Sequence, residues 1–264
     1  MSRGLPVPGS PAQGPPASRG RRVYVGCAGW SIPKSLSASF PAEGSHLQRY
    51  AARLSAVEIN SSFYRLHRPQ TYARWAATTP PDFRFAVKMP RAITHYGRLQ
   101  DLTVLPEFLA GPRELSEKLG PLLVQLPPSL VFARDVAERF FTALREQFAG
   151  RIACEPRHAS WFGTEAEILL RRFRVARVAA DPPPVPQAAV PGGWEEWTYY
   201  RLHGSPRLYY SSYADEALES LARRLQQDAK DKSEVWCIFN NTAAGAAHEN
   251  ALSLLARLER QDRD

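Results

Sequence analysis

Short runs of apolar, strand-forming residues alternate with amphipathic stretches along most of the chain. Eight such runs occur after residue 22, and they cover residues 23–29, 56–60, 84–89, 121–126, 151–155, 174–180, 197–204 and 234–241. Between most of them, apolar residues recur at the spacing of a helix. Short buried strands that alternate with helices are typical of a parallel sheet.

The amphipathic stretches also carry helix-start signals. Ser45 followed by Gln48 has the spacing of a capping box, in which each residue bonds the backbone of the other. Further helix starts are predicted at Asp135, at Thr164 with Glu167, and at Ser212 with Asp215. Residues 181–196 are the exception, because five prolines in this stretch make a regular helix unfavourable.

Eight strand–helix units in about 240 residues give about 30 residues per unit, the length of a βα unit. A closed (β/α)8 barrel of the TIM type, formed by residues 23–264 as a single domain, is therefore the predicted fold. An open doubly wound sheet is the alternative. It has less support, because residues 26–30 after the first run read GCAGW and lack the glycine spacing of a dinucleotide-binding loop.

The net charge of +8 is unevenly distributed. Residues 1–22 contain four arginines and no acidic residue, so half of the excess lies in this short segment. The same segment has five prolines, four glycines and no apolar core, which predicts a disordered basic tail. The rest of the chain is mildly basic, which favours an anionic ligand but does not by itself indicate a nucleic-acid-binding protein.

We expect a cytoplasmic protein with no membrane partner, because the sequence has neither an export signal nor a membrane-spanning apolar run. The three cysteines, Cys27, Cys154 and Cys237, lie far apart within apolar runs and are expected to be buried thiols. No histidine or carboxylate spacing is typical of a metal site, and basic residues lie nearby. We therefore predict no metal and no cofactor.

Polar residues gather at the carboxyl ends of the predicted strands, where barrel enzymes build their active sites. Seven of the eight runs carry such residues: Glu58 and Asn60; Lys88; Gln125; Glu155, Arg157 and His158; Asp181; Arg201 and His203; Asn240 and Asn241. Buried charges are unfavourable unless they are paired. The ring therefore indicates a ligand site, and a set of barrel-closing salt bridges is the alternative.

The residue types in the ring suggest roles. Three cations are expected to hold a carboxylate or a phosphate: Lys88, Arg157 and Arg201. Glu155 is the candidate general acid or base. His203 or His158 can shuttle protons near neutral pH, although a hydrogen-bonded structural role is as common for a single histidine.

Amides and aromatic rings complete the predicted site. Asn60, Gln125 and Asn241 are candidates for orienting hydroxyl groups of a substrate. Aromatic residues in the strand-end loops can stack on a base or a sugar ring, or can pack over the barrel mouth. They are Trp30, Phe63, Tyr64, Tyr96, Trp161, Tyr209, Tyr210 and Tyr213, of which Trp30, Tyr64 and Trp161 are the expected wall of the site.

Seven ordered segments together resemble the YecE-like family, also called domain of unknown function 72. They are VGCAGW at 25–30, VEINSSFYRL at 57–66, RFAVKMPRAITH at 84–95, LLVQLPPS at 122–129, CEPRHASWF at 154–162, YYRLHGSPRLYYSSY at 199–213 and CIFNNTAAGAAHENAL at 237–252. The resemblance covers nearly the whole chain after the tail.

The resemblance implies a TIM-type barrel but no particular reaction. It also implies shared pocket positions, which add His95 and Gly204 to the residues found at the strand ends. This chain departs from the family pattern in two places: Cys27 and Ala28 replace hydroxyl residues, and residues 240–242 lack an aspartate found in many relatives. A mechanism that needs a second acid at the eighth strand is therefore not expected.

Three functions remain open from the sequence. The first is an enzyme that acts on a small anionic compound, such as a phosphorylated or carboxylated sugar or nucleoside. The second is binding or processing of nucleic acid, in the manner of a barrel phosphodiesterase, which the basic tail and the loop aromatics favour. The third is a non-catalytic binding protein. A narrow positive pocket would favour the first function and a broad basic groove the second.

Overall fold

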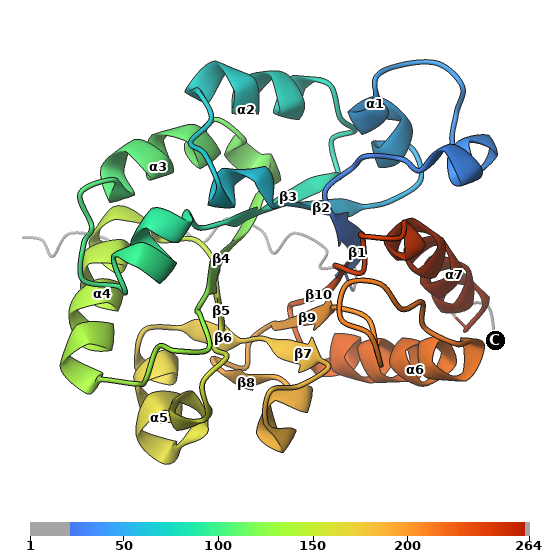
Figure 1. Cartoon of the computed structure of the whole chain (residues 1–264). Coiled ribbons are helices and arrows are strands. Elements are labelled where there is room, and N and C mark those ends of the chain that lie inside the picture. The colour runs from blue at the N-terminus through green and yellow to red at the C-terminus, as the bar shows by residue number, and fades with distance from the viewer. Residues whose placement is uncertain (1–21, 262–264) are drawn as a thin grey trace, which may run out of the picture.

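The strands of residues 22–261, the part of the chain that the computed structural model describes, curl into an almost closed barrel with helices around it (Figure 1). Neighbouring strands are parallel except for the pair β6 and β8, and their order is β7-β9-β10-β1-β2-β3-β4-β5-β6-β8. The strands are β1 (Arg22–Ala28), β2 (Ala56–Ile59), β3 (Arg84–Lys88), β4 (Leu119–Gln125), β5 (Ile152–Glu155), β6 (Val175–Arg177), β7 (Ala179–Asp181), β8 (Gly192–Gly193), β9 (Thr198–Leu202) and β10 (Glu234–Phe239).

The barrel closes through β6 and β7, which together replace the single sixth strand that was predicted. β6 pairs with β5, and β7 pairs with β9 on the other side. Only Val178 separates β6 from β7, and its N–H donates to the carbonyl of Cys154 at 2.9 Å. The predicted TIM-type barrel is thus confirmed, and the open sheet is wrong.

Helices occupy most of the connections between strands. They are α1 (His46–Ala51), α2 (Pro69–Ala77), α3 (Leu105–Arg113), α4 (Arg134–Gln147), α5 (Thr164–Arg172), α6 (Asp215–Asp231) and α7 (Ala246–Gln261). The capping box of Ser45 and Gln48 is confirmed at the start of α1. The other predicted caps are wrong. Asp135 and Thr164 lie inside the first turns of α4 and α5, and α6 begins after Ala214.

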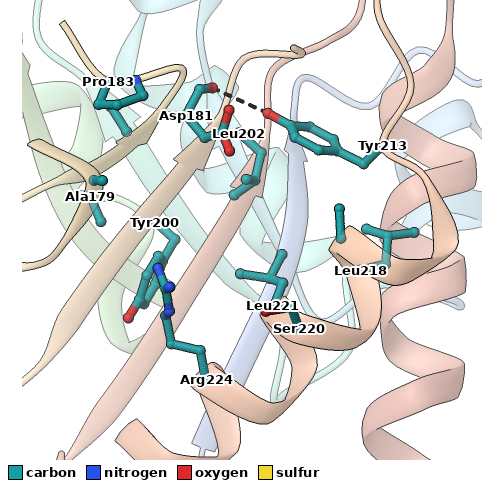
Figure 2. A pocket seen from close by; sticks show the side chains of 13 residues that line it. Ala179, Asp181, Pro183, Tyr200, Leu202, Tyr213, Leu218, Ser220, Leu221 and Arg224 are labelled. Atoms are coloured by element: carbon teal, nitrogen blue, oxygen red, sulfur yellow. Dashed lines mark hydrogen bonds between the residues drawn. The ribbon is translucent and has the colours of Figure 1, made fainter. Parts of the chain in front are cut away.

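The connection between β7 and β9 lacks an α-helix, as the prolines of residues 181–196 predict. It holds a short 3-10 helix (Pro186–Ala189) and the two-residue strand β8. A cavity of about 330 Å³ lies between this connection, β9 and α6 (Figure 2). Asp181 borders it, and the Tyr213 hydroxyl donates to the Asp181 carbonyl at 3.2 Å. Asp181, which belongs to the predicted ring, therefore faces this outer cavity.

Two apolar layers fix where each strand residue points. The layer inside the barrel includes Ala56, Ala86, Ala153, Tyr199 and Trp236. The larger layer between the strands and the helices takes the alternate residues, including all three cysteines, which are buried and free as predicted. Since successive residues of a strand point to opposite sides, the residues two positions after the interior alanines also point inward. Those residues are Glu58, Lys88 and Glu155.

None of the helices in residues 22–261 is long and apolar enough to cross a membrane. The disordered tail predicted for residues 1–22 lies outside the described residues, apart from Arg22, which begins β1.

Gly204, one of the positions implied by the family resemblance, has a backbone reason for being glycine. Its φ of +90° is unfavourable for other residues at the turn that follows β9.

His248, on α7, is a buried polar group that the barrel does not satisfy. Among the described residues, neither ring nitrogen of His248 has a hydrogen-bond partner. Its ring packs edge-on against Phe40 and Tyr50, with centroids 6.1 and 5.7 Å away. Burial lowers the pKa of His248 from 6.5 to about 4. The neutral imidazole is therefore the folded form at neutral pH.

We expect His248→Leu to raise the free energy of unfolding at pH 7 by about 1 kcal/mol, because an unsatisfied buried group is removed. Between pH 6.5 and 4 the unfolded wild type binds more protons than the folded one at this histidine, so stability is lost as the pH falls. The variant should lose less stability over this range. Urea unfolding of both proteins at pH 7 and pH 5 measures both effects, and a variant less stable than wild type at both values would contradict the interpretation.

Candidate functional site

A buried ion cluster lies inside the barrel at the carboxyl ends of β2, β5 and β9. Arg201 donates through Nε and Nη2 to Glu58, at 2.9 and 2.6 Å, and through Nη1 to Glu155 Oε2 at 2.6 Å. All three residues are at most 1% exposed. Burial alone would lower the pKa of Arg201, but Glu155 and Glu58 raise it above its usual value. All three nitrogens of the Arg201 guanidinium group thus donate to one of the two carboxylates.

Tyr199 also belongs to this cluster. Its hydroxyl donates to Glu58 Oε2 at 2.9 Å, and its ring stacks on Trp236 with centroids 6.1 Å apart. Glu58 belongs to the ring predicted from the sequence, whereas Tyr199 was missed. Alternation along β9 could have found it, since Tyr199, Arg201 and His203 share one side of the strand.

The second oxygen of Glu155 binds two further residues. Oε1 accepts from Arg157 Nη2 at 2.6 Å and lies 2.8 Å from His203 Nε2. Burial alone would raise the pKa of Glu155, but Arg201, His203 and Arg157 hold it well below its usual range. Glu155 is therefore a carboxylate at neutral pH, held by two arginines.

His203 lies in the middle of this group and is neutral at neutral pH. Its Nδ1 lies 3.0 Å from Asn240 Nδ2, and its Nε2 lies 2.8 Å from both Glu155 Oε1 and Arg157 Nη2. Burial lowers the pKa of His203 to about 4. The residue after β10 that reaches the cluster is thus Asn240, and not the predicted Asn241.

Lys88, at the end of β3, is the cation of this site that lacks a counterpart. Its ammonium lies 4.0 Å from the centroid of the Phe63 ring, and the residue is only 7% exposed. Within residues 22–261 the ammonium makes no hydrogen bond and no ion pair, although Glu58 and Glu155 are close enough to influence its charge. Burial, and next the charge of Arg201, lower its pKa from 10.5 to about 8. Glu58 and Glu155 act in the opposite direction.

Two polar atoms of the predicted site residues that follow β2 and β5 also lack a hydrogen-bond partner among the described residues. Arg157 Nε and Asn60 Oδ1 are both buried and unbonded. Asn60 follows β2 at the N-cap position of the short 3-10 helix Ser61–Phe63, where its side chain makes no capping hydrogen bond. Lys88, Arg157 and Asn60 thus each have a polar atom that can still bond to a ligand. In contrast, Glu58, Glu155 and Arg201 already bond to one another.

Five predicted site residues bond mainly to the protein itself. Trp161 is buried and donates to the Leu130 carbonyl, so it cannot form the wall of the site in this structure. Asn241 donates to Ser211 and Asn250, which joins the loop after β9 to α7. His158 caps the 3-10 helix Ala159–Phe162 through Nδ1. Trp30 packs on Trp75 of α2, and Gln125 donates to the carbonyl of Leu126.

The remaining two predicted residues lie around Phe63. The His95 ring contacts it edge-on at 4.9 Å, and the adjacent Tyr64 ring does so at 5.0 Å. Burial and the charges of Lys88 and Arg91 lower the pKa of His95. Tyr64 itself is 63% exposed. Within the described range, no three histidine, cysteine or acidic residues are placed to hold a metal ion.

Comparisons with known proteins agree with the resemblance found in the sequence. The UPF0759 protein YunF of Bacillus subtilis (strain 168) is 25% identical over 90% of this chain and 95% of its own length. The UPF0759 protein YecE of Escherichia coli (strain K12) is 31% identical over 62% of this chain and 60% of its own length.

Solved structures show the same fold. A DUF72 family protein from Thermotoga maritima MSB8 is 26% identical with a TM-score of 0.71, and covers 90% of this chain and 99% of its own. One from Enterococcus faecalis V583 is 22% identical with a TM-score of 0.77, and covers 90% and 95%. Residues 24–264 match the sequence model described as "Protein of unknown function DUF72". The chain therefore belongs to the DUF72 family, as the ordered motifs predict.

Proposed function

We propose that the barrel mouth binds a small anionic compound, such as a phosphorylated or carboxylated sugar or nucleoside, and that the chain acts on it as an enzyme. The observation that carries this proposal is the unpaired Lys88 ammonium. Two carboxylates, Glu58 and Glu155, face three cations, so the site has one positive charge in excess. A nearly buried cation without a partner is unfavourable, and a bound anion would balance it.

Lys88 and Arg157 are the groups that would hold the anion. Among the described residues, the Lys88 ammonium contacts the Phe63 ring but has no ion-pair partner, and Arg157 Nε has no hydrogen-bond partner. A purely structural salt-bridge ring accounts for Arg201 with its two carboxylates, but it does not account for Lys88. Arg201 would then act as a positioning residue that fixes Glu155. The Asn60 amide oxygen would orient a hydroxyl group of the substrate.

Glu155 and His203 would form the acid–base pair. Three groups in this one site have pKa values displaced from their usual range: Glu155 far downward, His203 to about 4 and Lys88 to about 8. Such clusters are typical of active sites. Arg157 shares Glu155 Oε1 with His203, so its movement toward a bound anion would leave that oxygen open to accept a proton. Hydrolysis, elimination and isomerisation all use proton transfer next to an anion.

A cytoplasmic location is part of this proposal. The three cysteines are free and buried, as is usual for proteins of a reducing compartment. Burial raises the pKa of all three thiols, that of Cys27 to about 12. None of these thiols is thus available as a nucleophile.

The test is thermal unfolding at constant ionic strength in chloride, sulfate, phosphate and a panel of sugar and nucleoside phosphates. We expect phosphate and sulfate to raise the melting temperature of wild type by a few degrees but not that of Lys88→Met. Lys230→Met, which removes an exposed cation from the last turn of α6, is the matched control and should respond like wild type.

Compounds that stabilise wild type would then be assayed for conversion. Turnover by wild type and loss of turnover in Glu155→Gln would support an enzyme. Stabilisation of wild type and Lys88→Met by the same amount would contradict Lys88 as the anion anchor.

A further inference from the structure

Two exposed tyrosines flank an arginine next to the proposed anion site. Tyr64 is 63% exposed and Tyr96 is 70% exposed, which is unusual for large aromatic side chains. The Arg91 guanidinium carbon lies 5.4 Å from the Tyr64 ring centroid and 5.3 Å from the Tyr96 ring centroid. We refer to these three residues as the Tyr64–Arg91–Tyr96 cluster. Exposed aromatic groups that gather in one place mark interaction sites.

The cluster borders a cavity of about 240 Å³, which Phe63 and Arg65 also line. This volume is below the range of pockets that enclose a whole drug-sized ligand. It is open and suits one flat ring, with arginine side chains on its border. A planar group that carries negative charge nearby would fit such a surface.

Phe63 contacts both the cluster and Lys88. One face of this ring lies under the Lys88 ammonium, at 4.0 Å, and Tyr64 contacts the same ring edge-on. A ligand that spans both sites therefore needs its anionic group and its ring only a short linker apart. A nucleoside phosphate has this geometry, with a sugar between phosphate and base.

The backbone that carries the cluster is held in place by the barrel. The Ser62 hydroxyl is close to the Ile59 carbonyl, at 2.7 Å, and the Lys88 carbonyl, at 2.6 Å. These contacts join the loop after β2, which carries Tyr64, to the end of β3. Arg91 and Tyr96 follow in and beside the short π-helix Ala92–Tyr96. The cluster is thus preorganised relative to Lys88.

We propose that the Tyr64–Arg91–Tyr96 cluster binds the base of a nucleotide whose phosphate lies at Lys88 and Arg157. This inference rests on the proposed function and names the substrate class of that site. The base would stack on a tyrosine ring, as bases do on aromatic side chains of proteins that bind single strands. Arg91 would keep the two rings apart and contribute positive charge. The nucleotide is either free or part of a single strand.

The experiment compares adenosine monophosphate with ribose 5-phosphate, which has the same anion but no base. Calorimetry should show that wild type binds the nucleotide at least ten times more tightly. The double variant Tyr64→Ala/Tyr96→Ala should lose this preference and keep its affinity for ribose 5-phosphate. The double variant Tyr64→Phe/Tyr96→Phe, which retains both rings, should restore the preference. A third arm with a ten-residue oligoadenylate distinguishes the sources, since tighter binding than the mononucleotide indicates a single strand.

The outcomes separate this inference from the proposed function. If wild type binds both compounds with equal affinity, the base site is wrong and the anion site stands. If wild type binds the nucleotide more tightly but the alanine variant does so equally, the base lies elsewhere and the cluster is wrong. If neither compound nor inorganic phosphate binds, both proposals fail.

Discussion

Arg201→Met is expected to lower the free energy of unfolding by about 3–5 kcal/mol, the range seen when one partner of a buried ion pair is removed. Arg201 makes the hydrogen bonds that neutralise Glu58 and Glu155, and all three side chains are buried. Without the guanidinium, two carboxylates would lie inside the barrel with only Arg157 and Lys88 nearby. Urea unfolding at pH 7 measures the loss.

Arg171→Met provides the control for this prediction. Arg171 pairs with Glu195, and both side chains are more than half exposed. An exposed pair contributes about 0.2–1 kcal/mol, so this variant should remain close to wild type. Equal and small effects of the two substitutions would show that the inner cluster does not hold the barrel together.

Glu155→Gln is expected to destabilise the protein by about 3 kcal/mol in chloride, because Arg201, Arg157 and His203 lose a charged acceptor. Part of this stability should return when sulfate is added. The substitution increases the positive charge of the site, so an anion should bind the variant more tightly than wild type and stabilise it more. A loss of stability that sulfate does not reduce would favour a salt-bridge ring with no ligand role.

The pH dependence of the same variant has a definite sign. The pKa of Glu155 in the folded protein lies well below its unfolded value, so its contribution is present at neutral pH. That contribution is lost as the pH falls through the folded value. Glu155→Gln lacks this carboxyl. Its stability should therefore fall less than that of wild type between pH 4 and pH 2, as measured by urea unfolding across this range.

The barrel was predictable because its strands and helices differ in period and length, and because prolines mark the one connection without a helix. The division of the sixth strand at Val178 could not be predicted, since residues 175–180 contain no glycine or proline that would mark an interruption. The failed caps have a local reason. Asp135 and Thr164 have the right residue types, but α4 begins two residues, and α5 one residue, earlier than a cap at that position requires.

Part of the site could be predicted because a buried strand with a charged last residue is unusual. The alternation of inward and outward side chains would have indicated Asn240 instead of Asn241. Trp236 and Ile238 of β10 face the interior, and Asn240 lies two residues further along the chain. The burial of Trp161 could not be predicted from the sequence. Its burial depends on Leu130 and Phe132, which come from a different loop. Contacts between loops need the three-dimensional fold.

The central claim is that Lys88 holds an anion, and the most direct test is the calorimetric affinity for sulfate as a function of pH. Sulfate keeps its charge from pH 7 to pH 10, whereas Lys88 loses its proton near pH 8. For wild type we predict saturable binding to one site at pH 7, with an affinity that falls roughly tenfold per pH unit above 8. Lys88→Met should bind sulfate at least ten times more weakly at pH 7 and show no such decline, while Lys230→Met should match wild type. A wild type that does not bind sulfate, or a Lys88→Met variant that binds it equally well, would contradict the account.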